Sequence, residues 1–155
     1  MTKKYNEDLG RPFTVHNENR PWGYYSLFSD NEPSTTKILY VKKGEMLSMQ
    51  YHFLRSQLYA IMDDGFIIDY STKPMPVKII QELDDDKRSE MLEDFLKHHL
   101  IKVKCGEGKL FGFRELVAHR ATYEGDRDFG RILDVAYGTN LEFDINRIKD
   151  KYNRK

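Results

Sequence analysis

Short runs of strand-forming residues, separated by turn signals about every 8 to 12 residues, constrain the fold more than any other feature of this sequence. The runs are rich in β-branched and aromatic residues, and polar turn clusters such as residues 29–33 close them. Residues 63–65 (Asp-Asp-Gly) have the chemistry of a hairpin turn. This pattern favours a sandwich or barrel, so we predict an all-β fold. The predicted strands cover residues 23–28, 37–41, 46–53, 58–62, 66–70, 109–113, 116–122 and 131–137.

Two segments depart from the strand pattern and predict helices. The acidic turn at residues 84–86 precedes apolar residues at helical spacing, including Met91, Leu92, Phe95 and Leu96. It predicts an amphipathic helix of about four turns, inserted within residues 80–102 or so, whose apolar stripe packs on the core. Residues 144–151 predict a second, short C-terminal helix with Asp144 as its cap.

Composition excludes several functional classes. The chain has 155 residues, a length that predicts a single domain over residues 1–155. It has 25 basic and 25 acidic side chains and a formal net charge of zero, so no nucleic-acid partner is expected. Cys105 is the single cysteine, which leaves no internal disulfide and no cysteine zinc site. No apolar run reaches the length of a membrane span, no secretory signal follows the first lysines, and no glycine-rich phosphate loop occurs. A cytoplasmic protein without a membrane partner is therefore expected.

Four polar residues are candidate ligands of one metal ion. Gln50 and His52 lie two positions apart in a predicted strand, so both side chains lie on the same face of it. Together with Gln57 and His119 they supply the imidazole and amide donors that borderline or hard divalent ions accept. A histidine on a strand is also commonly a packed, hydrogen-bonded side chain. Spacing alone leaves both interpretations open.

Four motifs in a fixed order give the sequence a family resemblance. The chain resembles the cupin domain of type II phosphomannose isomerases, which is also found fused to mannose-1-phosphate guanylyltransferases. The family pattern is P-W-G-x-Y, then K-P-G-E-x-L-S-L-Q-x-H-x-x-R-x-E, then H-R, and finally D-I-x-R-x-x-D-x-Y-x-R. The matching segments here are residues 20–25, Lys37, residues 44–52, Arg55, residues 119–120 and residues 144–154.

The resemblance implies a cupin double-stranded β-helix, or jelly-roll barrel, with a divalent metal such as zinc at its centre and a homodimeric assembly. It assigns Gln50, His52 and His119 to ligand positions. The third ligand position, normally Glu, is Gln57 in this chain. A neutral amide oxygen is a weaker donor than a carboxylate, so this departure predicts lower affinity for a divalent ion.

The resemblance also implies a function and the residues that perform it. The leading hypothesis is a metal-dependent sugar-phosphate isomerase that interconverts mannose 6-phosphate and fructose 6-phosphate through an enediol. Its alternatives are a non-catalytic sugar- or sugar-phosphate-binding cupin with a degraded metal site, and a further metal-cupin reaction such as oxygenation, which ordinarily uses more histidine ligands. An isomerase needs cations for phosphate and oxyanion, and a base that the sequence does not identify. The cationic catalytic candidates are Lys37, Arg55 and Arg120, and the substrate-binding candidates are Trp22 and Arg147.

Overall fold

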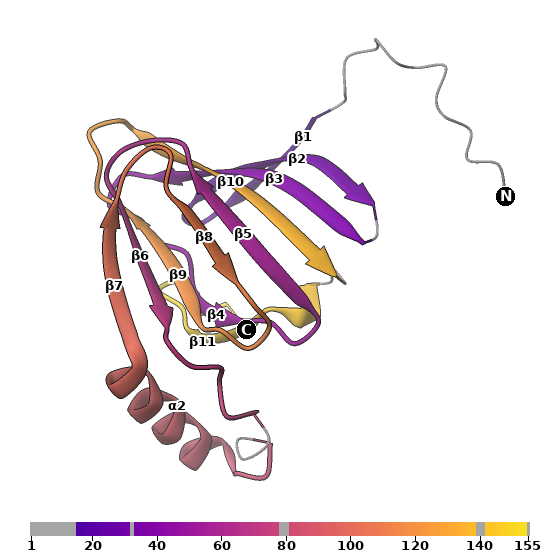
Figure 1. Cartoon of the computed structure of the whole chain (residues 1–155), viewed down its shortest axis with the longest axis vertical. Coiled ribbons are helices and arrows are strands. Elements are labelled where there is room, and N and C mark those ends of the chain that lie inside the picture. The colour runs from indigo at the N-terminus through magenta and orange to yellow at the C-terminus, as the bar shows by residue number, and fades with distance from the viewer. Residues whose placement is uncertain (1–14, 32, 78–80, 139–141, 155) are drawn as a thin grey trace, which may run out of the picture.

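Buried and more exposed side chains alternate along β4 (Met49–Tyr51), β5 (Arg55–Ile61), β9 (His119–Tyr123) and β10 (Phe129–Gly138), as expected for sheets packed face to face. The pattern is regular in β5 and β10, where every second side chain is buried. The computed structural model describes residues 15–31, 33–77, 81–138 and 142–154, and it has two antiparallel sheets (Figure 1). The prediction of an all-β fold is confirmed.

The first sheet has six strands and the second has five. Strands that are neighbours in space are often distant in sequence, because β10 lies between β3 and β5 and β9 lies between β4 and β6. Such crossing connections are typical of a jelly roll. The first sheet has the order β1 (His16–Arg20), β2 (Gly23–Asn31), β3 (Ser34–Lys42), β10, β5 and β8 (Leu110–Phe113). The second has the order β11 (Asn146–Lys149), β4 (Met49–Tyr51), β9 (His119–Tyr123), β6 (Phe66–Ser71) and β7 (Leu100–Cys105).

The turn at residues 63–65 does not close a hairpin. It joins β5 of the first sheet to β6 of the second, so the two strands that it connects are not paired. Gly65 has φ of 96°, and a Cβ atom there would lie 2.3 Å from Cα of Gly125. A residue without a side chain is therefore required where the chain passes from one sheet to the other close to Gly125. The prediction of a hairpin here is wrong.

A large apolar cluster fills the space between the sheets. It includes Val41, Tyr59, Phe66, Ile68 and Ile132, each exposed by no more than 2%. A smaller cluster lies between the second sheet and the helix, where Met49, Tyr51, Met75, Leu96 and Ala118 are buried together. The core thus continues on both sides of the second sheet.

The predicted helix is confirmed as α2 (Asp85–His99), which lies beyond the end of the barrel next to β6 and β7 (Figure 1). Asp84 caps it by accepting a hydrogen bond from the backbone N–H of Lys87 at 2.9 Å. The chain passes directly from α2 into β7, so the inserted segment also supplies a strand. Among the described residues, no helix combines the length and apolar character needed to cross a membrane.

The predicted C-terminal helix is wrong. Residues Glu142–Asp144 form one 3-10 turn, η1, and Asn146–Lys149 form β11, which pairs with β4. A helix would leave the edge of β4 without a partner, whereas strand pairing satisfies the backbone groups of both segments. The C-terminal segment consequently becomes part of the wall around the site.

Candidate functional site

An open cavity with about 90 Å³ of accessible volume is lined by residues of both sheets. Most of the site residues expected from the sequence line it, namely Trp22, Lys37, Gln50, Arg55, Gln57 and Arg147. Its remaining lining consists of Arg20, Tyr25, Leu39, Leu47, Ser48, Tyr59, Asp134, Ile145 and Arg154.

The cavity has an excess of positive charge. Five cationic side chains line it, and Asp134 is its one carboxylate among the described residues. Glu18 forms a salt bridge with Arg20, and Asp150 forms one with Arg154 at 2.6 Å. Lys37 lies over the ring of Tyr25, with its Nζ 4.8 Å from the ring centroid. An anionic ligand would therefore find cations on several sides of this cavity.

Two buried histidines lie side by side, with ring centroids 5.4 Å apart. His52 is 2% exposed and His119 is 1% exposed. The Nδ1 atom of His52 is 2.9 Å from the backbone oxygen of Asp144, and that of His119 is 2.9 Å from the backbone oxygen of Val117. Because a carbonyl oxygen only accepts, Nδ1 of His52 carries the proton of the neutral ring and its Nε2 presents a lone pair. His119 faces an acceptor on both sides, because its Nε2 lies 2.9 Å from Oε1 of Gln57, so its neutral ring can donate to only one of the two oxygens.

Burial keeps both imidazoles neutral. It is the main cause that lowers the pKa of His52 to about 3 and the pKa of His119 to about 4. Nearby positive charge adds to the effect, because Arg55 lowers the pKa of both rings. Both rings are therefore uncharged at neutral pH, and metal coordination requires a neutral imidazole.

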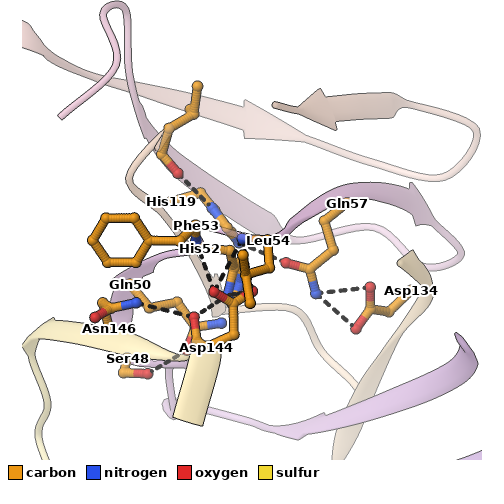
Figure 2. Close-up of polar contacts among 11 residues, drawn as sticks. Ser48, Gln50, His52, Phe53, Leu54, Gln57, His119, Asp134, Asp144 and Asn146 are labelled. Carbon is orange, nitrogen blue, oxygen red and sulfur yellow. Dashed lines mark hydrogen bonds and ion pairs between the residues drawn. The ribbon is translucent and has the colours of Figure 1, made fainter. Parts of the chain in front are cut away.

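Gln57 connects His119 to Asp134 (Figure 2). Its Oε1 lies 2.9 Å from Nε2 of His119, and its Nε2 donates to the two carboxylate oxygens of Asp134 at 2.9 and 3.0 Å. A neutral His119 donates either to Gln57 through Nε2 or to Val117 through Nδ1, and the other contact then has no hydrogen between its two acceptor atoms. Nε2 of His52, also buried, has no hydrogen-bond partner among the described residues.

These acceptors fit a cation. Nε2 of His52 lacks a donor, and Nε2 of His119 and Oε1 of Gln57 become two further acceptors when the His119 proton is on Nδ1. The Nδ1 atom of each histidine faces a backbone carbonyl, as in metal-bound histidines. A separation of 2.9 Å also suits two neighbouring ligand atoms of one ion with bonds of about 2.1 Å. No group of three or more His, Cys, Asp or Glu residues that could hold a metal occurs in the described parts of the chain. Any metal here would depend on amide oxygens as well as imidazoles.

Gln50 stands apart from the other predicted ligands. It lies opposite His119 in the pairing of β4 with β9, and its Oε1 accepts a hydrogen bond from Ser48 at 2.8 Å. The structure therefore brings His52, Gln57 and His119 together around one point, while the amide oxygen of Gln50 has a partner of its own.

Arg120 lies outside the cavity. It follows His119 in β9, and because successive side chains of a strand point to opposite faces, it leaves the face that His119 occupies. Its Nε donates to Asp69 at 3.0 Å, and Asp69 is 1% exposed. The family resemblance groups Arg120 with Lys37 and Arg55 as cationic residues of the site. In the structure Arg120 lies outside the cavity and forms an ion pair with Asp69.

Sequence reasoning missed two carboxylates of the site. Asp134 is 6% exposed, and burial raises its pKa. Asp144 is 2% exposed, and its Oδ1 accepts from the backbone N–H groups of Phe53 and Leu54 at 2.8 and 3.1 Å. Asp134 lies in a run with apolar residues on both faces, so alternation could not single it out. Asp144 has no neighbour in sequence that indicates its distant partners.

Comparison with known proteins agrees with this architecture. Residues 10–81 match the model of the family described as mannose-6-phosphate isomerase C-terminal, which confirms the resemblance over that segment. CapF of Staphylococcus aureus has a TM-score of 0.63 and 10% identity, over 90% of this chain and 34% of that one. An RmlC-like cupin from Shewanella frigidimarina has a TM-score of 0.56 and 12% identity, over 86% of this chain and 96% of that one. The fold is a cupin jelly roll.

KdgF from Halomonas sp. is a further structural neighbour of this cupin, with a TM-score of 0.56 and 8% identity, over 83% of this chain and 90% of that one. The cupin spans about a third of the length of the CapF chain. No curated protein matches its sequence significantly. At these identities the structural likeness shows the fold, and the chemistry has to be argued from the site.

Proposed function

We propose that this cupin is a metal-dependent isomerase of a phosphorylated hexose, with mannose 6-phosphate and fructose 6-phosphate as its substrate pair. The observation that carries the proposal is the buried Nε2 of His52, which has no hydrogen-bond partner among the described residues and lies beside His119 and the cavity-lining Gln57. The match of residues 10–81 to an isomerase-related family supports it.

The cavity provides the groups that a phosphorylated sugar needs. Lys37, Arg55 and Arg147 come from β3, β5 and β11, so cations converge on the cavity from three strands. Arginine and lysine bind a phosphate dianion through charge-assisted hydrogen bonds. Trp22 is 6% exposed and offers an apolar surface beside them.

His52, His119 and Gln57 would hold the divalent metal, such as zinc. A metal bound there would act as a Lewis acid for the oxyanion that forms when a proton moves between C1 and C2 of the sugar. Lys37 and Arg55 would add positive charge on the same side of the substrate.

A non-catalytic sugar-phosphate-binding cupin is the second candidate. It is favoured by the state of Asp134, because both oxygens of this lining carboxylate already accept hydrogen bonds from Gln57. An isomerase needs a base within reach of the C2 proton, and a carboxylate engaged in this way is poorly placed to serve.

A coupled assay with mannose 6-phosphate and added divalent metal separates the two candidates. We expect turnover by the wild-type protein, loss of turnover in His52→Ala, and weaker substrate binding in Lys37→Gln. Lys43→Gln is a matched control, because Lys43 is exposed and is not among the residues that line the cavity. Tight binding of mannose 6-phosphate without turnover would reject the isomerase and support the binding protein.

A further inference from the structure

The amide of Gln57 is held in one orientation by Asp134. Both oxygens of an ionised carboxylate are acceptors, so the group facing them across 2.9 and 3.0 Å has to be the NH₂ of Gln57. The amide oxygen is consequently turned to the opposite side, where it lies 2.9 Å from Nε2 of His119. Asp134 thereby determines which end of the amide faces the two histidines.

The surroundings leave few other ways to hold that amide. Gln57 and Asp134 are both 6% exposed, so water has little access to the contact. Asp134 is paired with Lys37 of β3 and with Tyr59 of β5 in the backbone register of the sheet. Burial raises the pKa of Asp134, and the positive charge of Lys37 and the hydrogen bonds from Gln57 oppose that rise by favouring the ionised carboxylate.

We propose that Asp134 is a positioning residue of the metal centre, which fixes the Gln57 oxygen toward His119 and His52 and makes an amide a usable metal ligand at position 57. The inference rests on the proposed metal site and deepens it. An unfixed amide could turn its NH₂ toward the metal, and an NH₂ group has no lone pair available for coordination. With Asp134 in place, only the oxygen is presented.

The same geometry explains why position 57 is not acidic in this chain. A glutamate there would bring a second carboxylate to about 3 Å from Asp134, where two negative charges repel each other strongly in a buried site. Gln57→Glu alone is therefore not a simple gain of a better ligand. The exchange Gln57→Glu with Asp134→Asn keeps one amide facing one carboxylate, with the carboxylate now beside the histidines.

Cobalt(II) titration tests the proposal, because the visible spectrum of bound cobalt reports both its affinity and its coordination. Asp134→Leu removes the acceptor, and we expect cobalt affinity to fall at least about tenfold, with a changed spectrum. Gln57→Glu should bind cobalt more weakly than the double exchange, and the double exchange should match or exceed the wild type. Asp69→Asn is the control, because it removes the charge of a buried carboxylate that contacts Arg120, on the face of β9 opposite His119.

Thermal unfolding of the metal-free variants separates positioning from general loss of structure. We expect Gln57→Glu to unfold at lower temperature than the wild type and the double exchange to recover most of that loss. Cobalt binding by the wild type that is unchanged in a folded Asp134→Leu would overturn the positioning role and leave the proposed function standing. Absence of cobalt binding by the wild type would overturn both.

Discussion

Asp144 joins the C-terminal segment to the candidate metal centre. Its carboxylate accepts hydrogen bonds from the backbone of Phe53 and Leu54, and its backbone oxygen holds Nδ1 of His52. These contacts link the turn before β5 with a residue about 90 positions later in the chain. The ring orientation of His52 therefore depends on a residue that is not part of the cavity lining.

Replacing Asp144 with Ala is expected to destabilise the protein by about 2 to 3 kcal/mol, because two buried backbone N–H groups lose a charged acceptor. Urea denaturation of the metal-free protein measures the loss. Asp144→Asn retains one acceptor oxygen and should lose clearly less. Equal losses in both variants would show that the carboxylate hydrogen bonds contribute little.

His52 and His119 make stability depend on pH. Their pKa values of about 3 and about 4 lie below the ordinary value of 6.5, so the unfolded chain binds protons first as the pH falls. Stability from these groups is complete above about pH 6.5 and is lost on acidification toward the folded pKa values. As the pH falls from about 7 to about 5, the free energy of unfolding should decrease by about 2 kcal/mol for each of the two histidines.

Denaturation of the metal-free protein at several pH values checks this expectation. Burial raises the pKa of Asp134, which acts in the opposite direction and reduces the net loss on acidification. His119→Gln lacks one of the titrating rings and should show a shallower dependence. The same slope in this variant and in the wild type would rule out His119 as a source of the effect.

At the scale of elements, α2 extends the core across the second sheet. Its buried residue, Leu96, packs in the cluster that contains Met49 and Tyr51 of β4 and Ala118, which immediately precedes β9. Gln50 lies in β4 and His119 opens β9, so the same two strands carry the helix on one side and site residues on the other. The inserted helix therefore packs against the two strands that position Gln50 and His119, on the side away from the site.

Leu96→Ala should destabilise the protein by about 2 to 4 kcal/mol through lost burial and a cavity. Glu90→Ala, at an exposed position of the same helix, should change stability by less than about 0.5 kcal/mol. Chemical denaturation of the two variants gives the comparison. A loss in Leu96→Ala no larger than in Glu90→Ala would mean that α2 is not part of the cooperative core.

The success of sequence-based prediction differs among the elements for physical reasons. The helix was predictable because its apolar residues recur at helical spacing behind an acidic cap, both of which are local signals. β11 was mistaken for a helix because its strand form depends on pairing with β4, about 100 positions earlier. β1 consists of the polar residues His-Asn-Glu-Asn-Arg and is held by pairing with β2, so no apolar pattern marks it.

In the candidate site, too, residues marked by a sequence motif were predicted, and residues whose roles depend on distant partners were not. His52, Gln57 and His119 were found through motifs, and the structure brings them together. Asp134 and Asp144 were missed because their roles come from hydrogen bonds to residues 77 and 91 positions away. Arg120 was misplaced because the motif gave its position in the sequence but not the face of β9 from which it projects.

At the scale of the whole molecule, a net charge of zero conceals an uneven distribution. Five of the 25 basic residues line the cavity. A second pocket, around the turn at residues 63–65, is mainly acidic and is lined by Asp63, Asp64, Glu107, Glu124 and Asp126. Selection of an anionic ligand therefore comes from local placement and not from overall charge. Electrostatic attraction of this kind is weakened by salt.

Mannose 6-phosphate should consequently bind more weakly as ionic strength rises from about 0.01 M to about 1 M, over which the Debye length falls from about 30 Å to about 3 Å. Binding of unphosphorylated mannose should change little, because it has no charge to screen. Isothermal titration calorimetry of both sugars gives the two salt dependences. Arg147→Gln should reduce the salt dependence for the phosphate, whereas Lys104→Gln, at an exposed position of β7, should leave it unchanged. Equal salt dependence for the two sugars would show that the cationic cavity does not recognise the phosphate.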